Sequence, residues 1–266
     1  MAGVSRLQRA GAQVDELGLD GLLVTTPSNI RYLTGFTGST GYVLVGADGT
    51  ATAVTDRRYE ERIADELTDA DVRIRIAPGA GRRELTELLA TGSLGVEAAN
   101  VSWAEVQQLT EMLGSERVRS TTGVIEGLRE HKDELEVDII RRAAAIADRA
   151  FGAVIANMVP GTSELDIAYA FESAVREAGG DGIAYDTIVA SGPNASRPHH
   201  ATGRRGIEQG DLVIVDAGAM VDGYRSDMTR TFVIGEPTDQ QQVMLDAVLE
   251  AQIAGVAAVT LSLIHI

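Results

Sequence analysis

The spacing of hydrophobic residues in the first 125 positions changes repeatedly between the period of a helix and that of a strand. Apolar residues recur at helical spacing in segments that we predict as helices, at 4–17, 57–67, 82–90 and 102–112. Short apolar or alternating runs predict strands at 21–25, 42–45, 51–55, 72–76 and 94–96. The Gly-, Ser- and Thr-rich residues 26–42 are predicted as a turn and a loop. Short strands alternating with helices indicate an α/β domain with a partly parallel sheet.

Beyond residues 121–130, where we expect a domain boundary, the pattern changes to long helices and a pair of strands. Helices are predicted over 132–158, from Thr162 or Ser163 to 178, and over 238–259. The first of them would bury one face, formed by Leu135, Ile139, Ala143, Ile146, Ala150 and Val154. The rest is predicted as a strand over 184–190, a loop over 191–205, and two strands with a short connection over 211–234.

Charge and composition exclude several classes of protein. The 266 residues carry a formal net charge of −16, which argues against nonspecific binding to nucleic acid or to anionic membranes. There is no cysteine, so a disulfide, a thiolate nucleophile and a zinc site with cysteine ligands are excluded. The first residues lack the apolar core of a signal peptide, and no run of about 18 apolar residues predicts a membrane span. We therefore expect a cytoplasmic protein.

Two aspartates in the predicted strand pair are the first candidates for chemistry. Asp216 ends an apolar run, and Asp227 precedes a β-prone run eleven positions further on. Neighbouring strands could bring both carboxylates to one point, where they would repel each other unless a cation or a proton lay between them. Such oxygen ligands suit manganese, magnesium or calcium, and they also serve zinc, cobalt or iron. From the spacing alone, the favoured interpretation is a strand end and a solvated turn residue.

Five collinear segments change this interpretation. They read SNIRYLTGFTGS at 28–39, ELEVDIIRRAAAIADRAF at 134–151, PGTSELDIA at 160–168, IVASGPNASRPHH at 188–200 and DLVIVDAGAMVDGYRSDMTRTFVIGEP at 211–237. In this order they resemble the aminopeptidase P, prolidase and creatinase group of pita-bread metallopeptidases. The resemblance extends to about Val259, and its last segment is highly specific. We therefore favour a functional role for Asp216 and Asp227.

The resemblance implies an α/β creatinase-like N-terminal domain at 1–125, followed at 131–266 by the first half of an α+β pita-bread catalytic domain. The family's ligands (Asp, Asp, His, Glu and Glu) hold two divalent metal ions, usually manganese, with cobalt and zinc as alternatives. Asp216 matches the ligand of one ion, and Asp227 matches the ligand that bridges both. The ions would lower the pKa of a shared water and polarise the scissile carbonyl. His199 matches the loop histidine that would hydrogen-bond the substrate or the tetrahedral intermediate.

The implied activity is hydrolysis of the bond before proline, in dipeptides by a prolidase or at longer N-termini by an aminopeptidase P. The residues do not distinguish these two activities. Proline-containing peptides are the expected partners, and a homodimer is expected for the full-length protein. Two alternatives stay open. One is a creatinase-like amidinohydrolase, against which both aspartates argue because that enzyme needs no metal. The other is a non-catalytic binding module on the same fold.

The family's remaining metal ligands lie in a His-Gly-x-Gly-His type segment and at two later glutamates, and none of these occurs in the 266 residues. After Val259 the chain reads TLSLIHI, which matches nothing expected in the family. We therefore expect a truncated sequence whose residues Leu261 to Ile266 are non-native. Because two carboxylates alone should bind metal weakly, we also expect the chain by itself to be inactive.

Several other side chains carry smaller predictions. Arg225 and Arg230 flank Asp227, and they could equally orient the carboxylates or pair with surface acids. Among the histidines, His131 is expected to be exposed, and His200 is expected to matter less than His199. Aromatic side chains predicted for the core are Tyr32, Phe36 and Trp103.

Overall fold

The computed structural model describes residues 5–67, 72–78 and 92–259, and the chain divides into two units, Met1–Lys132 and Asp133–Ile266. The predicted helix at 82–90 and the tail from 260 lie outside the described residues. None of the helices in the described part of the chain is both long and apolar enough to cross a membrane. Each unit has its own hydrophobic core, so the two are described separately.

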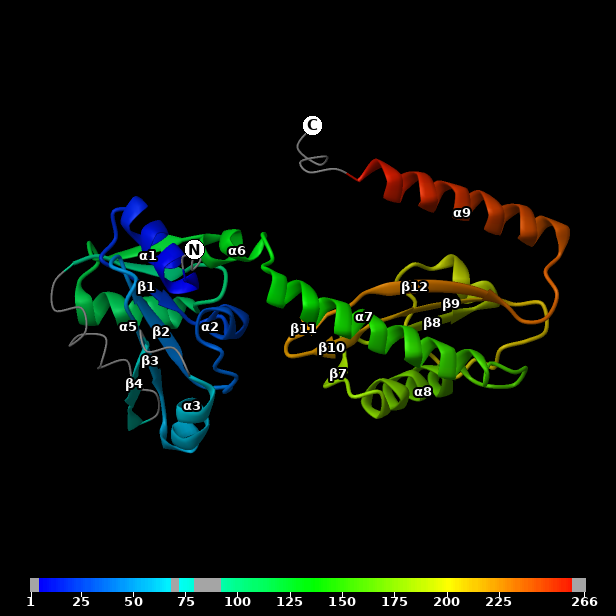
Figure 1. The fold of residues 1–266 in the computed structure, drawn as a ribbon, viewed down its shortest axis with the longest axis horizontal. Helices are drawn as coiled ribbons and strands as arrows, with labels where there is room; N and C mark the ends of the chain where they lie inside the picture. Colours follow the sequence, from blue (N-terminus) through cyan, green and yellow to red (C-terminus); the bar gives the residue numbers. More distant parts are fainter. Residues whose placement is uncertain (1–4, 68–71, 79–91, 260–266) are drawn as a thin grey trace. The chain divides into compact units, whose positions relative to one another are not determined.

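Within the described residues of the first unit, one sheet has the strand order β4-β3-β2-β1-β5-β6 (Figure 1). Its strands are β1 (Gly21–Val24), β2 (Tyr42–Gly46), β3 (Ala51–Thr55), β4 (Val72–Ile76), β5 (Leu94–Glu97) and β6 (Val118–Thr121). Strand β2 is antiparallel to β1 and to β3, whereas β5 is parallel to β1 and β6, and β3 is parallel to β4. The predicted α/β domain with a partly parallel sheet is therefore confirmed.

Helices cover both faces of this sheet. They are α1 (Arg6–Glu16), α2 (Pro27–Thr34), α3 (Glu60–Glu66), α5 (Trp103–Leu113) and α6 (Val124–Arg129), together with the short 3-10 helix η1 (Arg57–Tyr59). Side chains alternate across a strand, so Leu22 packs in the core that contains Leu7 of α1, while Leu23 packs in the core that contains Leu109 of α5. Burial on both faces explains why the inner strands are continuous apolar runs.

Two predictions for the first unit are wrong. Residues 26–34 are not a turn and loop, because Pro27 begins helix α2 and Gly35, with φ of 81°, ends it. Proline has the right φ for the first helical residue, and glycine accepts the left-handed conformation that closes a helix. Trp103 is 75% exposed, although Tyr32 and Phe36 are buried as expected. It is the first residue of α5, directly after the cap Ser102, so it lies outside the helix's buried stripe.

The described strands of the second unit form two small sheets. One has the order β11-β10-β7 and the other the order β12-β9-β8, and all their pairings are antiparallel. The strands are β7 (Gly182–Ile183), β8 (Ile188–Ser191), β9 (Leu212–Ala217), β10 (Ala219–Val221), β11 (Tyr224–Arg225) and β12 (Met228–Val233). Of the predicted strand at 184–190, only the part from Ile188 onwards is a strand, β8. The short connection expected within 211–234 is itself the hairpin β10–β11.

Two long helices pack on these strands, and a third does not share their core. Helices α7 (Glu134–Ile155) and α8 (Glu164–Glu177) lie side by side, and Phe151 meets Phe171 edge to face, with ring centroids 5.0 Å apart. Their buried stripes join the inner side chains of β8, β9 and β10. Leu135, expected on this face, is 73% exposed, and it is the neighbouring Glu136 that is buried in the first turn of α7.

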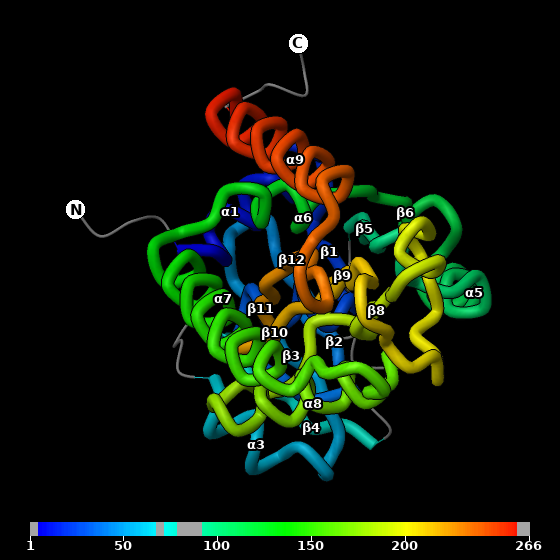
Figure 2. Tube along the Cα trace, turned by 90° about the vertical axis from the view of Figure 1, so that its right-hand side faces the viewer, coloured from blue at the N-terminus to red at the C-terminus, as the bar shows by residue number. Residues whose placement is uncertain are grey.

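Helix α9 (Asp239–Ala258) has no buried residue. In Figures 1 and 2 it lies on the side of the strands away from α8. Six of its large apolar side chains are between 47% and 70% exposed, namely Val243, Met244, Val248, Leu249, Ile253 and Val256. The capping box at Thr238, with Gln241 as its partner, fixes where the helix begins.

Candidate metal centre

Asp216 and Asp227 converge on one atom. The Tyr185 hydroxyl oxygen lies 2.7 Å from Oδ1 of Asp216 and 2.7 Å from Oδ1 of Asp227. Asp216 is near the end of β9, where it is the register partner of Ile188 on β8 and of Thr229 on β12. Asp227 directly precedes β12, and Tyr185 lies in the connection between β7 and β8. The structure therefore brings the two predicted carboxylates together.

The alternation along β9 explains which way Asp216 points. Val213, Val215 and Ala217 are buried in the core shared with α7 and α8, and the residues between them are half-buried. Successive side chains of a strand point to opposite faces, so Asp216 lies on the face away from those helices. A carboxylate on this face is accessible to an ion or a substrate. At the position before or after Asp216, the side chain would instead point into the apolar core.

Local turns bring Asp227 back to the same place. Asp222 and Gly223 have φ of 49° and 75°, and they form the two-residue turn of the β10–β11 hairpin. At Gly218, between β9 and β10, an added Cβ would lie 1.9 Å from the Ser226 carbonyl oxygen. Only glycine allows the returning backbone to come this close. The Gly-rich connection therefore determines that Asp227 ends beside Asp216.

Among the residues that the structure describes, Tyr185 is the hydrogen-bond donor found for the Asp216 and Asp227 carboxylates. A phenol has one hydrogen, so the Tyr185 hydroxyl can donate to one of the two carboxylates at a time. Burial, followed by the hydrogen bonds to Asp216 and Asp227 and their negative charges, raises the pKa of Tyr185 well above its usual range. The phenol therefore stays neutral at physiological pH and leaves most of the carboxylate charge uncompensated.

This donor set fits a divalent cation in part. Two carboxylates that face one point are hard oxygen ligands, which suit manganese or magnesium and can serve zinc. In the described part of the chain, no three His, Asp or Glu side chains are grouped so that they could hold a metal ion. Asp216 and Asp227 could thus supply two ligands of a larger set.

The structure separates the roles of the two adjacent histidines. Both lie in the loop after the short 3-10 helix η3 (Gly192–Ser196). His199 is exposed, and the hydrogen bonds found among the described residues do not include its side chain. His200 is half-buried, and its Nε2 lies 2.8 Å from Oε2 of Glu164. His199 is therefore accessible from solvent, while His200 is engaged in holding the loop.

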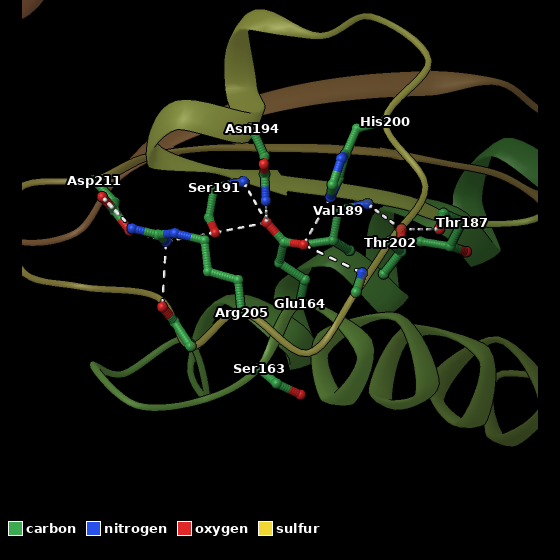
Figure 3. Close-up of polar contacts among 12 residues, drawn as sticks. Ser163, Glu164, Thr187, Val189, Ser191, Asn194, His200, Thr202, Arg205 and Asp211 are labelled. Carbon is green, nitrogen blue, oxygen red and sulfur yellow. Dashed lines mark hydrogen bonds and ion pairs between the residues drawn. The ribbon is translucent and has the colours of Figure 1, made fainter.

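Glu164 is a site residue that the sequence interpretation missed. Its side chain is fully buried at the first residue of α8 (Figure 3). Oε1 accepts from Ser191 N, Ser191 Oγ and Asn194 Nδ2, at 2.9, 2.7 and 2.9 Å, and Oε2 accepts from His200 Nε2 and Gly203 N, at 2.8 and 3.2 Å. Burial alone would raise the pKa of Glu164, but the hydrogen bonds from Asn194, His200 and Ser191 outweigh it and lower the pKa to about 2.

Arg205 closes the far end of the same loop. Its Nη1 donates to Ser191 Oγ at 2.8 Å and to Asp211 Oδ2 at 2.5 Å (Figure 3). The hydrogen bond to Asp211 raises the pKa of Arg205, so the guanidinium remains charged. The loop is thus fixed at both of its ends by polar contacts with β8 and the residue before β9.

The structure also answers the predictions for Arg230 and His131, and it adds Tyr185 and Glu164 to the candidate site residues. Nη2 of Arg230 lies 3.8 Å from Oδ1 of Asp148, so of the two roles left open for Arg230 the surface ion pair is the observed one. His131 is exposed, as predicted. Tyr185 and Glu164 could not be found from spacing, because each reaches its partners across more than 25 positions.

Comparison with known proteins gives two family matches. Residues 138–262 match the model described as metallopeptidase family M24, and residues 6–131 match the creatinase/prolidase N-terminal domain. The chain is 32% identical to the Xaa-Pro dipeptidase of Pyrococcus furiosus, over 95% of this chain and 71% of the dipeptidase.

Solved structures agree with these matches. An Xaa-Pro dipeptidase from Bacillus anthracis superimposes with a TM-score of 0.89 at 32% identity, covering 96% of this chain and 72% of that one. An X-Pro aminopeptidase from Thermotoga maritima gives a TM-score of 0.82 at 29% identity, covering 90% and 70%. The proteins that this chain is similar to therefore include Xaa-Pro dipeptidases as well as an X-Pro aminopeptidase.

Proposed function

Since this chain belongs to metallopeptidase family M24, we propose that it acts in the metal-dependent hydrolysis of Xaa-Pro bonds, as a prolidase or an aminopeptidase P does. The observation that carries the proposal is the convergence of Asp216 and Asp227 on the Tyr185 hydroxyl. The similar proteins named Xaa-Pro dipeptidase and X-Pro aminopeptidase support the substrate class, proline-containing peptides.

Asp216 and Asp227 would contribute ligands to two divalent ions. Manganese is our first choice, and cobalt or zinc could replace it, because carboxylate oxygens accept all three. When bound, such ions act as Lewis acids that acidify a water molecule and polarise a carbonyl group. Tyr185 would orient the two carboxylates, since its neutral hydroxyl lies at hydrogen-bond distance from both.

His199 would contact the substrate. Its side chain is exposed on the loop that follows β8, the strand next to Asp216. A neutral imidazole can donate one hydrogen bond to a carbonyl oxygen and, as charge develops on that oxygen, stabilise it. The adjacent His200 is engaged with Glu164 and is therefore not the substrate-facing residue in this proposal.

A non-catalytic binding module is the second candidate. It is favoured by the finding that the described residues contain no group of three metal-ligating side chains. That the 266 residues by themselves bind metal weakly and are inactive stays a prediction from the sequence. A creatinase-like amidinohydrolase remains disfavoured, because it would not need two converging carboxylates. A homodimer of the full-length protein and a cytoplasmic location stay predictions from the sequence.

The test is a manganese titration of the full-length protein, in which the hydrolysis of an Xaa-Pro dipeptide is followed in the same samples. The proposal predicts hydrolysis that depends on manganese and is abolished by Asp216→Asn. Asp138→Asn is the matched control, because Asp138 is an exposed acid whose partner is Arg141 on the same helix. Manganese-dependent hydrolysis that persists in Asp216→Asn would refute the site. Binding of the peptide without any hydrolysis would favour the binding module.

A further inference from the structure

Glu164 accepts hydrogen bonds from the loop that carries His199, the residue proposed to contact the substrate. We propose that Glu164 is a positioning residue, which fixes residues 192–203 and thereby determines where the His199 imidazole lies. This inference rests on the function proposed for His199. Glu164 itself would touch neither metal nor substrate, because its side chain is fully buried and both carboxylate oxygens are engaged by the loop.

The contacts of Glu164 are distributed along the whole loop. Ser191 is the last residue of β8, Asn194 lies in η3, His200 follows His199 directly, and Gly203 is near the loop's end. Figure 3 shows the side chains of Ser191, Asn194 and His200 turned towards the Glu164 carboxylate. Consecutive Cα atoms are about 3.8 Å apart, so fixing His200 leaves the backbone of His199 little freedom.

Glu164 is held in place by helix α8, which is anchored in the core of the second unit. Glu164 opens α8, and Ile167 and Phe171 of that helix are buried in the core of the second unit. The first turn of a helix favours a negative charge, so an ionised carboxylate is stable there. Backbone hydrogen bonds, Leu165 N to Gly203 O and Glu164 N to Arg205 O, at 2.9 and 3.0 Å, fix the end of the loop independently. Glu164 therefore controls the middle of the loop, where His199 lies.

Histidine NMR measures this control directly. The chain has His131, His199, His200 and His265, so selective ring labelling gives few signals to assign. In Glu164→Ala we expect the His199 signal to move towards that of exposed His131, and the amides of 192–203 to exchange at least about tenfold faster. His200→Ala should produce the same changes near His199 without removing the buried charge, and His200→Gln, which keeps an amide donor, should restore part of the order.

A matched control separates positioning from general loss of stability. Glu136 is also a buried glutamate in the first turn of a helix, α7, and accepts a hydrogen bond from Tyr224 at 2.8 Å. Glu136→Ala should lower the melting temperature and leave the His199 signal and the exchange of 192–203 unchanged. Glu164→Ala and His200→Ala proteins in which both readouts match the wild type would overturn the proposal.

The catalytic consequence is tested by a double-mutant cycle in the Xaa-Pro dipeptide assay. If Glu164 acts through His199, Glu164→Gln should lower kcat by about tenfold or more and leave manganese affinity within about twofold, and it should add almost nothing in the His199→Ala background. Additive losses would overturn the link to His199. A full-length wild-type protein without hydrolysis would refute the proposed function, and the NMR and exchange results would then decide the positioning of His199 by themselves.

Discussion

The second unit contains two carboxylate sites, Glu164 at the start of helix α8 and the pair Asp216 and Asp227 beside strands β9 and β12, and they differ in how their negative charge is compensated. Glu164 is buried among five hydrogen-bond contacts, which hold its pKa at about 2. Asp216 and Asp227 share the single hydrogen of Tyr185. A carboxylate that the protein itself satisfies contributes to structure, whereas a pair that shares one donor has charge left for a cation. The two sites differ in donors and also in burial, because Glu164 is fully buried, whereas Asp216 is half-buried and Asp227 is exposed.

Removing one carboxylate of the pair should have the largest effect. In Asp227→Ala the remaining ligand cannot hold two ions, so we expect manganese affinity, measured by calorimetry, to fall by about a hundredfold or more. Because an uncompensated negative charge is removed as well, the metal-free chain should lose no stability. Equal manganese affinity in the variant and the wild type would show that the pair is not the metal site.

Glu164→Gln should have the second-largest effect, a loss of folding stability that depends on pH. The folded pKa of about 2 lies below the ordinary 4.5, so the stabilisation by Glu164 is fully present above pH 4.5 and is lost as the pH falls towards 2. A shift of this size corresponds to about 3 kcal/mol at neutral pH, and less than about half of that should remain at pH 3. Urea unfolding of both proteins at pH 7 and pH 3 measures the difference. A difference that does not change with pH would contradict the charge-based account.

Tyr185→Phe should have a smaller effect, and one that depends on metal. Loss of the hydroxyl removes the hydrogen bond that the carboxylates share, which should lower the stability of the metal-free chain by about 1–2 kcal/mol. Manganese should reduce this deficit, because the cation takes over the compensation of charge. Thermal unfolding with and without manganese tests this, and a deficit that manganese does not change would argue against a shared role for the hydroxyl.

Arg230→Ala should have the smallest effect. Its ion pair with Asp148 is long, at 3.8 Å, and both side chains are about half exposed or more. Exposed pairs of this kind contribute less than about 1 kcal/mol. Manganese affinity should remain within about twofold of the wild type in calorimetry. A large loss of affinity would mean that Arg230 orients the carboxylates after all.

Much of the architecture follows from the hydrophobic pattern, and the exceptions have physical causes. The long helix α7, the hairpin β2–β3 and the cap at Ser102 were predictable because each depends on neighbours in sequence. Helix α2 was missed because its Pro27 and Gly35 also suit a turn. Burial of Trp103 was predicted from its chemistry alone, although its exposure depends on where α5 begins.

Of the candidate site, the two aspartates and the loop histidine could be proposed from the sequence, whereas Tyr185 and Glu164 could not. Asp216 and Asp227 were found because their motif is continuous along the chain, and the structure brings them together. Tyr185 and Glu164 were missed because their roles depend on contacts between segments far apart in sequence. The sequence places two histidines side by side and cannot show which of them contacts Glu164. That His200 makes this contact is a property of the folded loop.

The most direct test of the central claim is a titration of the isotope-labelled chain with manganese, followed by NMR. A paramagnetic ion broadens the signals of residues close to it, so it reports where it binds without any need for catalysis. We predict that broadening begins at Tyr185, Asp216 and Asp227, and that it is lost in Asp216→Asn. Broadening that begins around Glu164, or that spreads evenly over the acidic surface, would contradict the claim that the undersatisfied pair is the metal site.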